Sequence, residues 1–359
     1  MFIESSKGGM QEIVLTLMEG LIRSGYDCTM LTTQTSELIS SCLSRGIPCD
    51  TLRSSNCRLA PLFLLGGFVR YIFKNRNSLF IVNDIYTHVL MSMYFLPKKE
   101  IFVSHGGNYK ERGKQYASNS GITSIIARLY SFKRVSRFVA VSDTQKENLA
   151  NNAKVNRSKI TVIPNSILPV RRALIESNKT RLSMVGYIKP LKNQLEILKA
   201  LSLLREEGFD VCLNIFGSIS DSEYFNQLET YITENKLVDE VKFWGYIDNK
   251  ELIYSNTDIL ISASFHEGFG LTLVEAMSCG VPTIAYRGAE GPASIINNNK
   301  TGILVERNSY ECYSEAVKLY IQDKLLTENI CKEAYLDYIA NYNINKMVDK
   351  YKIEIERYN

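Results

Sequence analysis

The segment from Ser262 to Gly280 has the residue types and spacing that favour chemistry most clearly. It reads Ser-Ala-Ser-Phe-His-Glu-Gly-Phe-Gly-Leu-Thr-Leu-Val-Glu-Ala-Met-Ser-Cys-Gly, a pattern typical of a strand end, a glycine-bearing loop and a helix. Gly268 and Gly270 allow tight turns and a close approach of the backbone to a ligand. We expect the helix to begin near Gly270 or Leu271 and to end before Gly280. The unpaired N–H groups and the dipole at its start would form an anion site suited to a diphosphate.

Two carboxylates flank the start of that helix. Glu267 lies in the loop and Glu275 about one turn into the helix, so at about 1.5 Å per residue they would be roughly 10 Å apart. That distance is too large for two carboxylates that share one proton. It suits one carboxylate that binds sugar hydroxyls and another that binds a ribose, with a diphosphate between them. Taken alone, Glu275 would be an ordinary solvated helix residue, but the whole strand–loop–helix pattern favours a binding role.

Short β-branched runs alternate with longer helical patterns along the whole chain. Strands are expected at residues 28–32, 79–82, 101–104, 138–141, 159–163, 181–185, 213–216, 241–243, 259–262, 283–285 and 302–305. Helices are expected between them, among others at residues 10–24, 37–45, 62–75, 123–133 and 144–151, and the tail 311–359 is helical. Strands separated by helices predict parallel sheets of the α/β class.

A break in this alternation predicts two domains. Pro164, Pro169 and the polar run 176–180 interrupt the pattern before it starts again. We therefore expect Rossmann-like, doubly wound parallel-sheet domains at residues 1–166 and 167–340, facing across a cleft. A C-terminal helix, residues 341–359, is expected to pack back towards the first domain.

The composition is globular, but its charge is uneven. Hydrophobic residues make up 45% and charged residues 22% of the 359, which excludes disordered and disulfide-stapled proteins. Residues 1–166 contain 21 Lys and Arg against 11 Asp and Glu, a net charge of +10, whereas the remainder has a net charge of −6. The basic half predicts contact with phosphates or an anionic membrane surface, the alternative being a merely solvated surface. Because this charge is spread out and no nucleic-acid-binding motif occurs, we expect no nucleic-acid partner.

The cysteines and histidines predict no metal site. The eight cysteines include no CxxC pair, and the three histidines have no metal-ligand spacing. The first residues do not resemble a signal peptide, and no stretch of 18 clean apolar residues occurs. We therefore expect reduced thiols in a cytoplasmic protein without a spanning helix.

The segment that begins at Glu267 resembles a motif of a known family. Glu-Gly-Phe-Gly-Leu-Thr-Leu-Val-Glu, which begins at Glu267, resembles the E-x7-E motif of the retaining glycosyltransferases of family 4, whose GT-B fold has two Rossmann-like domains. The resemblance covers nearly the whole chain. Other segments that are similar to the family pattern are Gly8-Gly9, Ser104-His105-Gly106, Val139–Ser142, Val162–Ser166, Val185-Gly186, Lys192-Asn193 and Phe243–Ile247.

The resemblance implies roles for single residues. Glu267 would bind or polarise the donor sugar, and His105 would lie near that sugar. Lys192 would neutralise the leaving diphosphate in place of a divalent metal. The family carries Arg where this chain has Tyr187; either Lys189 supplies that charge or the activity is weaker.

The resemblance also assigns the remaining donor contacts. Glu275 would hold the ribose hydroxyls, and the segment around Tyr246 would lie beside the nucleobase. The other positions that it assigns to donor binding are Gly9, Gly186, Gly270, Leu271 and Thr272.

The implied activity is sugar transfer from a UDP- or GDP-sugar to a hydroxyl of a glycan or a polyprenyl-diphosphate-linked acceptor, in surface polysaccharide biosynthesis. The anomeric configuration would be retained, and no metal or further cofactor is expected. Two alternatives stay open: a sugar-nucleotide epimerase on the same scaffold, and a non-catalytic partner subunit that binds a sugar nucleotide. The acceptor would lie at the inner face of the plasma membrane, against the basic residues Lys98, Lys99, Lys110, Arg112, Lys114, Lys133, Arg134 and Arg137.

Overall fold

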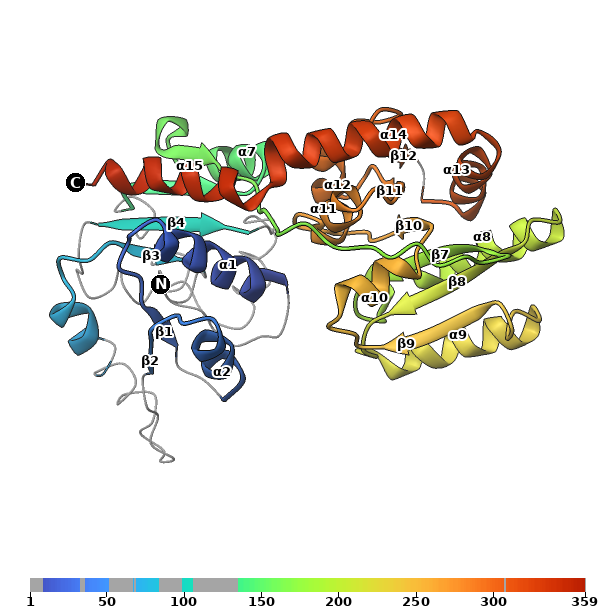
Figure 1. Ribbon diagram of the computed structural model, residues 1–359, viewed down its shortest axis with the longest axis horizontal. Helices are drawn as coiled ribbons and strands as arrows, with labels where there is room; N and C mark the ends of the chain where they lie inside the picture. The colour runs from blue at the N-terminus through green and yellow to red at the C-terminus, as the bar shows by residue number, and fades with distance from the viewer. Residues whose placement is uncertain are drawn as a thin grey trace. The chain divides into compact units, whose positions relative to one another are not determined.

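The computed structural model describes residues 9–32, 36–51, 69–83, 99–105, 135–306 and 308–358, together with Gly67 (Figure 1). The chain divides into two compact units: unit 1 is Met1–Ser166 with Ile344–Asn359, and unit 2 is Ile167–Asn343. No helix among the described residues is long and apolar enough to span a membrane. Positions discussed above that lie outside the described residues are Gly8, Lys98, Gly106, Lys110, Arg112, Lys114, Lys133, Arg134, the predicted helix at 123–133 and part of the one at 62–75.

The described strands of unit 1 are all parallel. One sheet pairs β1 with β2, and the other has the order β3-β4-β5-β6. The strands are β1 (Met30–Thr32), β2 (Cys49–Thr51), β3 (Phe80–Val82), β4 (Glu100–Ser104), β5 (Arg137–Ala140) and β6 (Ile160–Val162). The helices are α1 (Gly9–Arg23), α2 (Ser36–Ser44), α7 (Asp143–Asn152) and α15 (Ile344–Glu356). The strand β2 was not predicted from the sequence, because its Cys-Asp-Thr is short, polar and largely exposed.

The last helix, α15, belongs to unit 1 although it follows unit 2 in the sequence. It lies against α1, where Gly20 contacts Val348 so closely that a Cβ at Gly20 would overlap the valine side chain (Figure 1). Thr161 on β6 donates a hydrogen bond to the buried Glu354 of α15 at 2.8 Å. Apolar packing and a partly buried hydrogen bond thus hold the helix on this unit.

Unit 2 is a doubly wound domain around one six-stranded parallel sheet with the order β12-β11-β10-β7-β8-β9. Its strands are β7 (Thr180–Val185), β8 (Val211–Phe216), β9 (Val241–Gly245), β10 (Ile259–Ser262), β11 (Thr283–Tyr286) and β12 (Ile303–Val305). Its α-helices are α8 (Gln194–Glu206), α9 (Ser222–Glu234), α10 (Lys250–Ser255), α11 (Leu271–Ser278), α12 (Glu290–Ile295), α13 (Tyr310–Gln322) and α14 (Lys324–Asp337). The short turns are η2 (Pro190–Lys192), which is 3₁₀, and η3 (Tyr338–Tyr342), which is π-helical. The expected parallel α/β architecture is therefore confirmed.

The strand order of unit 2 reverses between β7 and β10. From β7 the chain adds β8 and β9 on one side, and it then crosses over to add β10, β11 and β12 on the other. Apolar side chains such as Leu182, Leu213 and Ile284 are fully buried in the core that the sheet shares with its helices. In sheets of this kind, ligands bind at the carboxyl ends of the strands where the order reverses.

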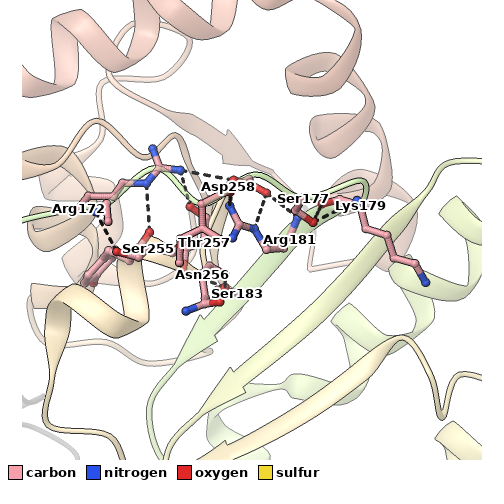
Figure 2. Close-up of polar contacts among 12 residues, drawn as sticks. Arg172, Ser177, Lys179, Arg181, Ser183, Ser255, Asn256, Thr257 and Asp258 are labelled. Atoms are coloured by element: carbon pink, nitrogen blue, oxygen red, sulfur yellow. Dashed lines mark hydrogen bonds and ion pairs between the residues drawn. The ribbon is translucent and has the colours of Figure 1, made fainter.

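A cluster of charges ties together the amino ends of those same two strands (Figure 2). The guanidinium of Arg181 in β7 donates two hydrogen bonds to the carboxylate of Asp258, which directly precedes β10, at 2.9 and 2.8 Å, and the backbone N–H of Arg181 donates a third at 2.9 Å. Arg172, from the segment leading into β7, donates to the carbonyl of Thr257 at 2.8 Å and approaches Asp258 at 3.4 Å. We call Arg172, Arg181 and Asp258 the Asp258 clamp. It fixes β7 against β10 at the edge opposite to their carboxyl ends.

Candidate functional site

A pocket opens at the carboxyl ends of β7 and β10, where the strand order reverses. Met184, Val185 and Gly186 line it from β7 and the turn that follows. The other lining residues are Lys192, Gln194, Ile261, Ser262, Ala263, Ser264, Glu267 and Thr272. Four residues that the family resemblance assigned to the donor thus line one pocket: Gly186, Lys192, Glu267 and Thr272.

An ion pair in this pocket joins Lys192 and Glu267. The Lys192 Nζ lies 2.5 Å from Glu267 Oε2, and the two side chains are 21% and 24% exposed. Such a charge-assisted hydrogen bond is stronger than one between neutral groups. A bound anion would compete with the carboxylate for the ammonium, and a hydroxyl-bearing ligand would compete with the ammonium for the carboxylate. The pair therefore presents one positive and one negative group to a ligand that carries both phosphate and hydroxyls.

Glycine turns hold the pocket backbone in place. Gly186 has φ 145° and Gly217, after β8, has φ 154°, a backbone region that residues with a Cβ rarely adopt. A Cβ at Gly217 would overlap the carbonyl of Gly186, and a Cβ at Gly186 would lie 3.3 Å from Lys192 Cε. The turn after β7 therefore lies between a second backbone turn and the lysine.

The helix at the pocket, α11, begins and ends where the sequence predicts. Gly270, with φ 98°, precedes Leu271 at its start and has no side chain that could cap the helix. The first amide N–H groups, those of Leu271 and Thr272, are at the helix terminus, where the dipole favours an anion. Gly270 also lies against Glu267, since a Cβ there would be 3.7 Å from Glu267 Cγ. The helix start and the loop carboxylate are thus neighbours.

Glu275 lies one turn further along α11 and is nearly buried. Its Oε1 is 2.7 Å from Lys250 Nζ, and its Oε2 accepts a hydrogen bond from Tyr254 at 2.8 Å. Burial, together with the charge of Glu275, raises the pKa of Tyr254 well above its usual value, so this phenol stays a donor. Because each carboxylate oxygen has two lone pairs, Glu275 can keep both partners and still accept hydrogen bonds from a ligand.

His105 lies in unit 1, directly after β4. Its Nε2 is 2.9 Å from Oδ1 of Asn83, which directly follows β3. Burial lowers the pKa of His105 to about 4, so the ring is neutral near pH 7. Among the described residues, neither His105 Nδ1 nor Asn83 Nδ2 has a hydrogen-bond partner. A neutral imidazole here can form hydrogen bonds to a ligand but adds no charge.

The remaining predicted site residues, Lys189, Tyr246 and Gly9, are not among those that line the pocket. Lys189 precedes η2, and its Nζ lies 5.8 Å from the centre of the Tyr187 ring, within the range of a cation–π contact. Tyr246 follows β9 and donates to Asp248 at 3.2 Å. Gly9 is the exposed first residue of α1 in unit 1.

Sequence reasoning missed three residues that contact this site. Lys250 and Tyr254 hold Glu275, and Gln194 lines the pocket while only 1% exposed. Only Gln194 had a readable signal, since it is a polar residue that directly follows Lys192-Asn193 at a helix start. Lys250 and Tyr254 come from α10, and only the fold brings α10 to α11.

Two protein-family models match consecutive parts of the chain, which together span residues 7–337. The model described as Glycosyltransferase Family 4 matches residues 7–171, and the one described as Glycosyl transferases group 1 matches residues 170–337. Their junction falls at the start of the segment that leads into β7, close to the division between the two units.

Curated relatives and solved structures agree with these matches. The poly(glycerol-phosphate) alpha-glucosyltransferase of Bacillus subtilis is 28% identical over 193 residues, 51% of this chain and 28% of that protein. The UDP-Gal:alpha-D-GlcNAc-diphosphoundecaprenol alpha-1,3-galactosyltransferase of Escherichia coli is 25% identical over 303 residues, 73% of this chain and 77% of that protein. The crystal structure of Anabaena HepE with UDP and glucose has a TM-score of 0.83 at 16% identity and covers 99% of this chain and 98% of that one. This last likeness shows the fold.

Proposed function

Because the chain belongs to glycosyltransferase family 4, whose two domain models together match residues 7–337, we propose that it transfers a sugar from a nucleoside-diphosphate sugar to a hydroxyl. The observation that carries the proposal is the Lys192–Glu267 pair in the pocket between the carboxyl ends of β7 and β10. One ligand that needs both charges side by side is a sugar linked to a diphosphate.

The residues around the pocket divide the work between them. Lys192 and the N–H groups at the start of α11 face the diphosphate, where negative charge develops as the glycosidic bond breaks. Glu267 accepts hydrogen bonds from the sugar hydroxyls and so fixes the sugar for attack. Glu275, held by Lys250 and Tyr254, binds the ribose.

The reaction proposed retains the anomeric configuration. The acceptor hydroxyl attacks on the face from which the diphosphate leaves, and a diphosphate oxygen takes the acceptor's proton. The positive charge at the leaving group comes from Lys192, so transfer should proceed without a divalent metal. Retention is read from the anomeric coupling of the product by NMR, and metal independence from the rate in excess EDTA.

Glu267→Ala provides the test of the proposal. Wild type, incubated with a panel of UDP- and GDP-sugars and lipid-linked or glycan acceptors, should transfer one sugar, and Glu267→Ala should bind that donor more weakly and transfer it at least about 100-fold more slowly. Glu290→Ala, an acidic residue of α12, is the matched control and should transfer at the wild-type rate. No transfer by wild type with any donor, together with equal donor binding by Glu267→Ala, would refute the proposal. Donor binding without turnover would favour the non-catalytic subunit, and a changed free sugar nucleotide would favour an epimerase.

The acceptor that we propose is a polyprenyl-diphosphate-linked glycan of surface polysaccharide synthesis. The E. coli relative is named for such an acceptor, and residues 1–166 of this chain have a net charge of +10. Each Lys or Arg near an anionic lipid surface contributes about 1 kcal/mol, which salt screens.

The membrane contact is tested by co-sedimentation with vesicles. The protein should pellet with vesicles that contain anionic lipid at low salt and should be released at high salt. Pelleting that depends neither on salt nor on lipid charge would contradict an electrostatic attachment.

A further inference from the structure

Oε1 of Gln194 is a buried polar atom at the pocket to which the proposed roles assign no partner. Gln194 is the first residue of α8 and lines the pocket together with Lys192 and Glu267. Its side chain is 1% exposed, and Oε1 has no hydrogen-bond partner among the residues that the structure describes. Leaving a buried amide oxygen without a partner destabilises the fold, so its presence calls for a reason.

The orientation of this amide follows from the backbone. Nε2 of Gln194 donates to the carbonyl of Tyr187 at 3.0 Å, in the turn that follows β7. If the amide were rotated by 180°, two oxygens would face each other and the N–H groups would lose this acceptor. The carbonyl of Tyr187 therefore fixes Oε1, and not Nε2, as the atom free for a ligand.

The chemistry of an amide oxygen limits the ligand group that it can meet. Oε1 only accepts hydrogen bonds, and the oxygens of an ionised diphosphate are likewise only acceptors, so the diphosphate cannot be its partner. The ribose and base are assigned to Glu275 and to the segment around Tyr246. Of the parts of the donor that reach Glu267, only the transferred sugar has hydroxyl groups that donate.

On this basis, which rests on the proposed function, we propose that Gln194 is a specificity-determining residue that accepts a hydrogen bond from one hydroxyl of the transferred sugar. The Lys192–Glu267 pair lies at the same pocket. When the donor separates this pair, with Lys192 on the diphosphate and Glu267 on the sugar, Oε1 of Gln194 gains a hydroxyl partner. A donor without that hydroxyl leaves the amide oxygen buried and unpaired, which the enzyme should reject.

The experiment compares a donor with its deoxy analogues. UDP-glucose and its 2-, 3-, 4- and 6-deoxy forms are used, or the matching set for the donor sugar that wild type accepts. Wild type should discriminate against one of these analogues by about 10- to 100-fold in kcat/KM. Gln194→Met keeps the length of the side chain without the amide. In this variant, kcat/KM for the rejected analogue should lie within about threefold of kcat/KM for the full donor, and discrimination against the other analogues should be unchanged.

Gln145→Met provides the matched control, because Gln145 is a fully buried glutamine in the first turn of α7 in unit 1. Gln145→Met should discriminate among the deoxy analogues as strongly as wild type does. Fluorescence of Trp244, the one tryptophan in the sequence, checks that unit 2 of Gln194→Met is folded, and the same donor set is compared by Kd if the variant turns over too slowly.

The outcomes separate this inference from the proposed function. If wild type transfers sugar but Gln194→Met slows all donors by one common factor, Gln194 only supports the turn at Tyr187 and the inference is wrong. If folded Gln194→Met discriminates against the same deoxy analogue as strongly as wild type does, the inference is also wrong. If wild type neither binds nor transfers any donor, the proposed function itself fails.

Discussion

Lys192→Met should lower kcat by about 100- to 1,000-fold, because it removes the positive charge that faces the leaving diphosphate. Negative charge on the diphosphate is larger in the transition state than in the bound donor, so kcat should fall more than donor affinity. The Lys192 Nζ lies 2.5 Å from Glu267 Oε2, which places the charge in the pocket. Steady-state kinetics with the donor identified by the panel measure both parameters.

A second lysine of the same region is the control for this prediction. Lys199 is on the adjoining α8 and forms an ion pair at 3.7 Å with Glu196 one turn away. Lys199→Met removes the same charge from unit 2 and should leave kcat within twofold of wild type. A kcat for folded Lys192→Met within threefold of wild type would show that Lys192 does not stabilise the leaving group.

Asp258→Asn should lower the free energy of unfolding of unit 2 by about 3 kcal/mol, since it leaves two largely buried guanidinium groups without their shared carboxylate. Urea unfolding followed by Trp244 fluorescence measures this change in unit 2 alone. The indole ring stacks on Phe216 with centroids 5.2 Å apart, and Trp244 is the one tryptophan in the sequence, so its emission reports this sheet. The control, Glu306→Gln, removes an exposed ion pair with Arg287 and should cost less than about 1 kcal/mol.

The contribution of the Asp258 clamp should also depend on pH. Burial by itself would raise the pKa of Asp258, but hydrogen bonds from Arg181 and the charges of Arg181 and Arg172 outweigh it and hold the pKa below its usual value. A carboxyl group with a lowered pKa stabilises the fold above the pKa that it has in the unfolded chain, about 3.9, and loses this effect as pH falls through the folded value. The difference between wild type and Asp258→Asn should therefore be full at pH 7 and shrink below about pH 4. A difference that stays constant down to pH 3 would contradict the electrostatic origin.

The strands of both units were readable from the sequence because parallel strands buried on both faces leave continuous apolar runs. The predicted strand at 259–262 has the same bounds as β10, and the helix of the E-x7-E segment is α11, Leu271–Ser278. The missed strand, β2, shows where this signal fails. Its Cys-Asp-Thr is neither apolar nor alternating, and only its pairing with β1 makes it a strand.

The site was readable where its residues are close in sequence. Glu267, Gly270 and Thr272 come from one loop and helix, so spacing alone brings them together, and Lys192 joined them through the family resemblance. The partners of Glu275 were not readable, because Tyr254 and Lys250 reach it only through the packing of α10 against α11. Asn83 and His105 are 22 residues apart and meet only because β3 and β4 are neighbours in the sheet.

The central claim is that the Lys192–Glu267 pocket holds the diphosphate and the sugar of the donor. A crystal structure of the protein with the donor identified by the panel, or with UDP if none is turned over, tests it most directly. We expect a diphosphate oxygen within 3.2 Å of Lys192 Nζ and of the amide N–H groups that begin α11, with the bond between Lys192 and Glu267 broken. A nucleotide bound elsewhere, with the Lys192–Glu267 pair intact and the pocket empty, would contradict the account.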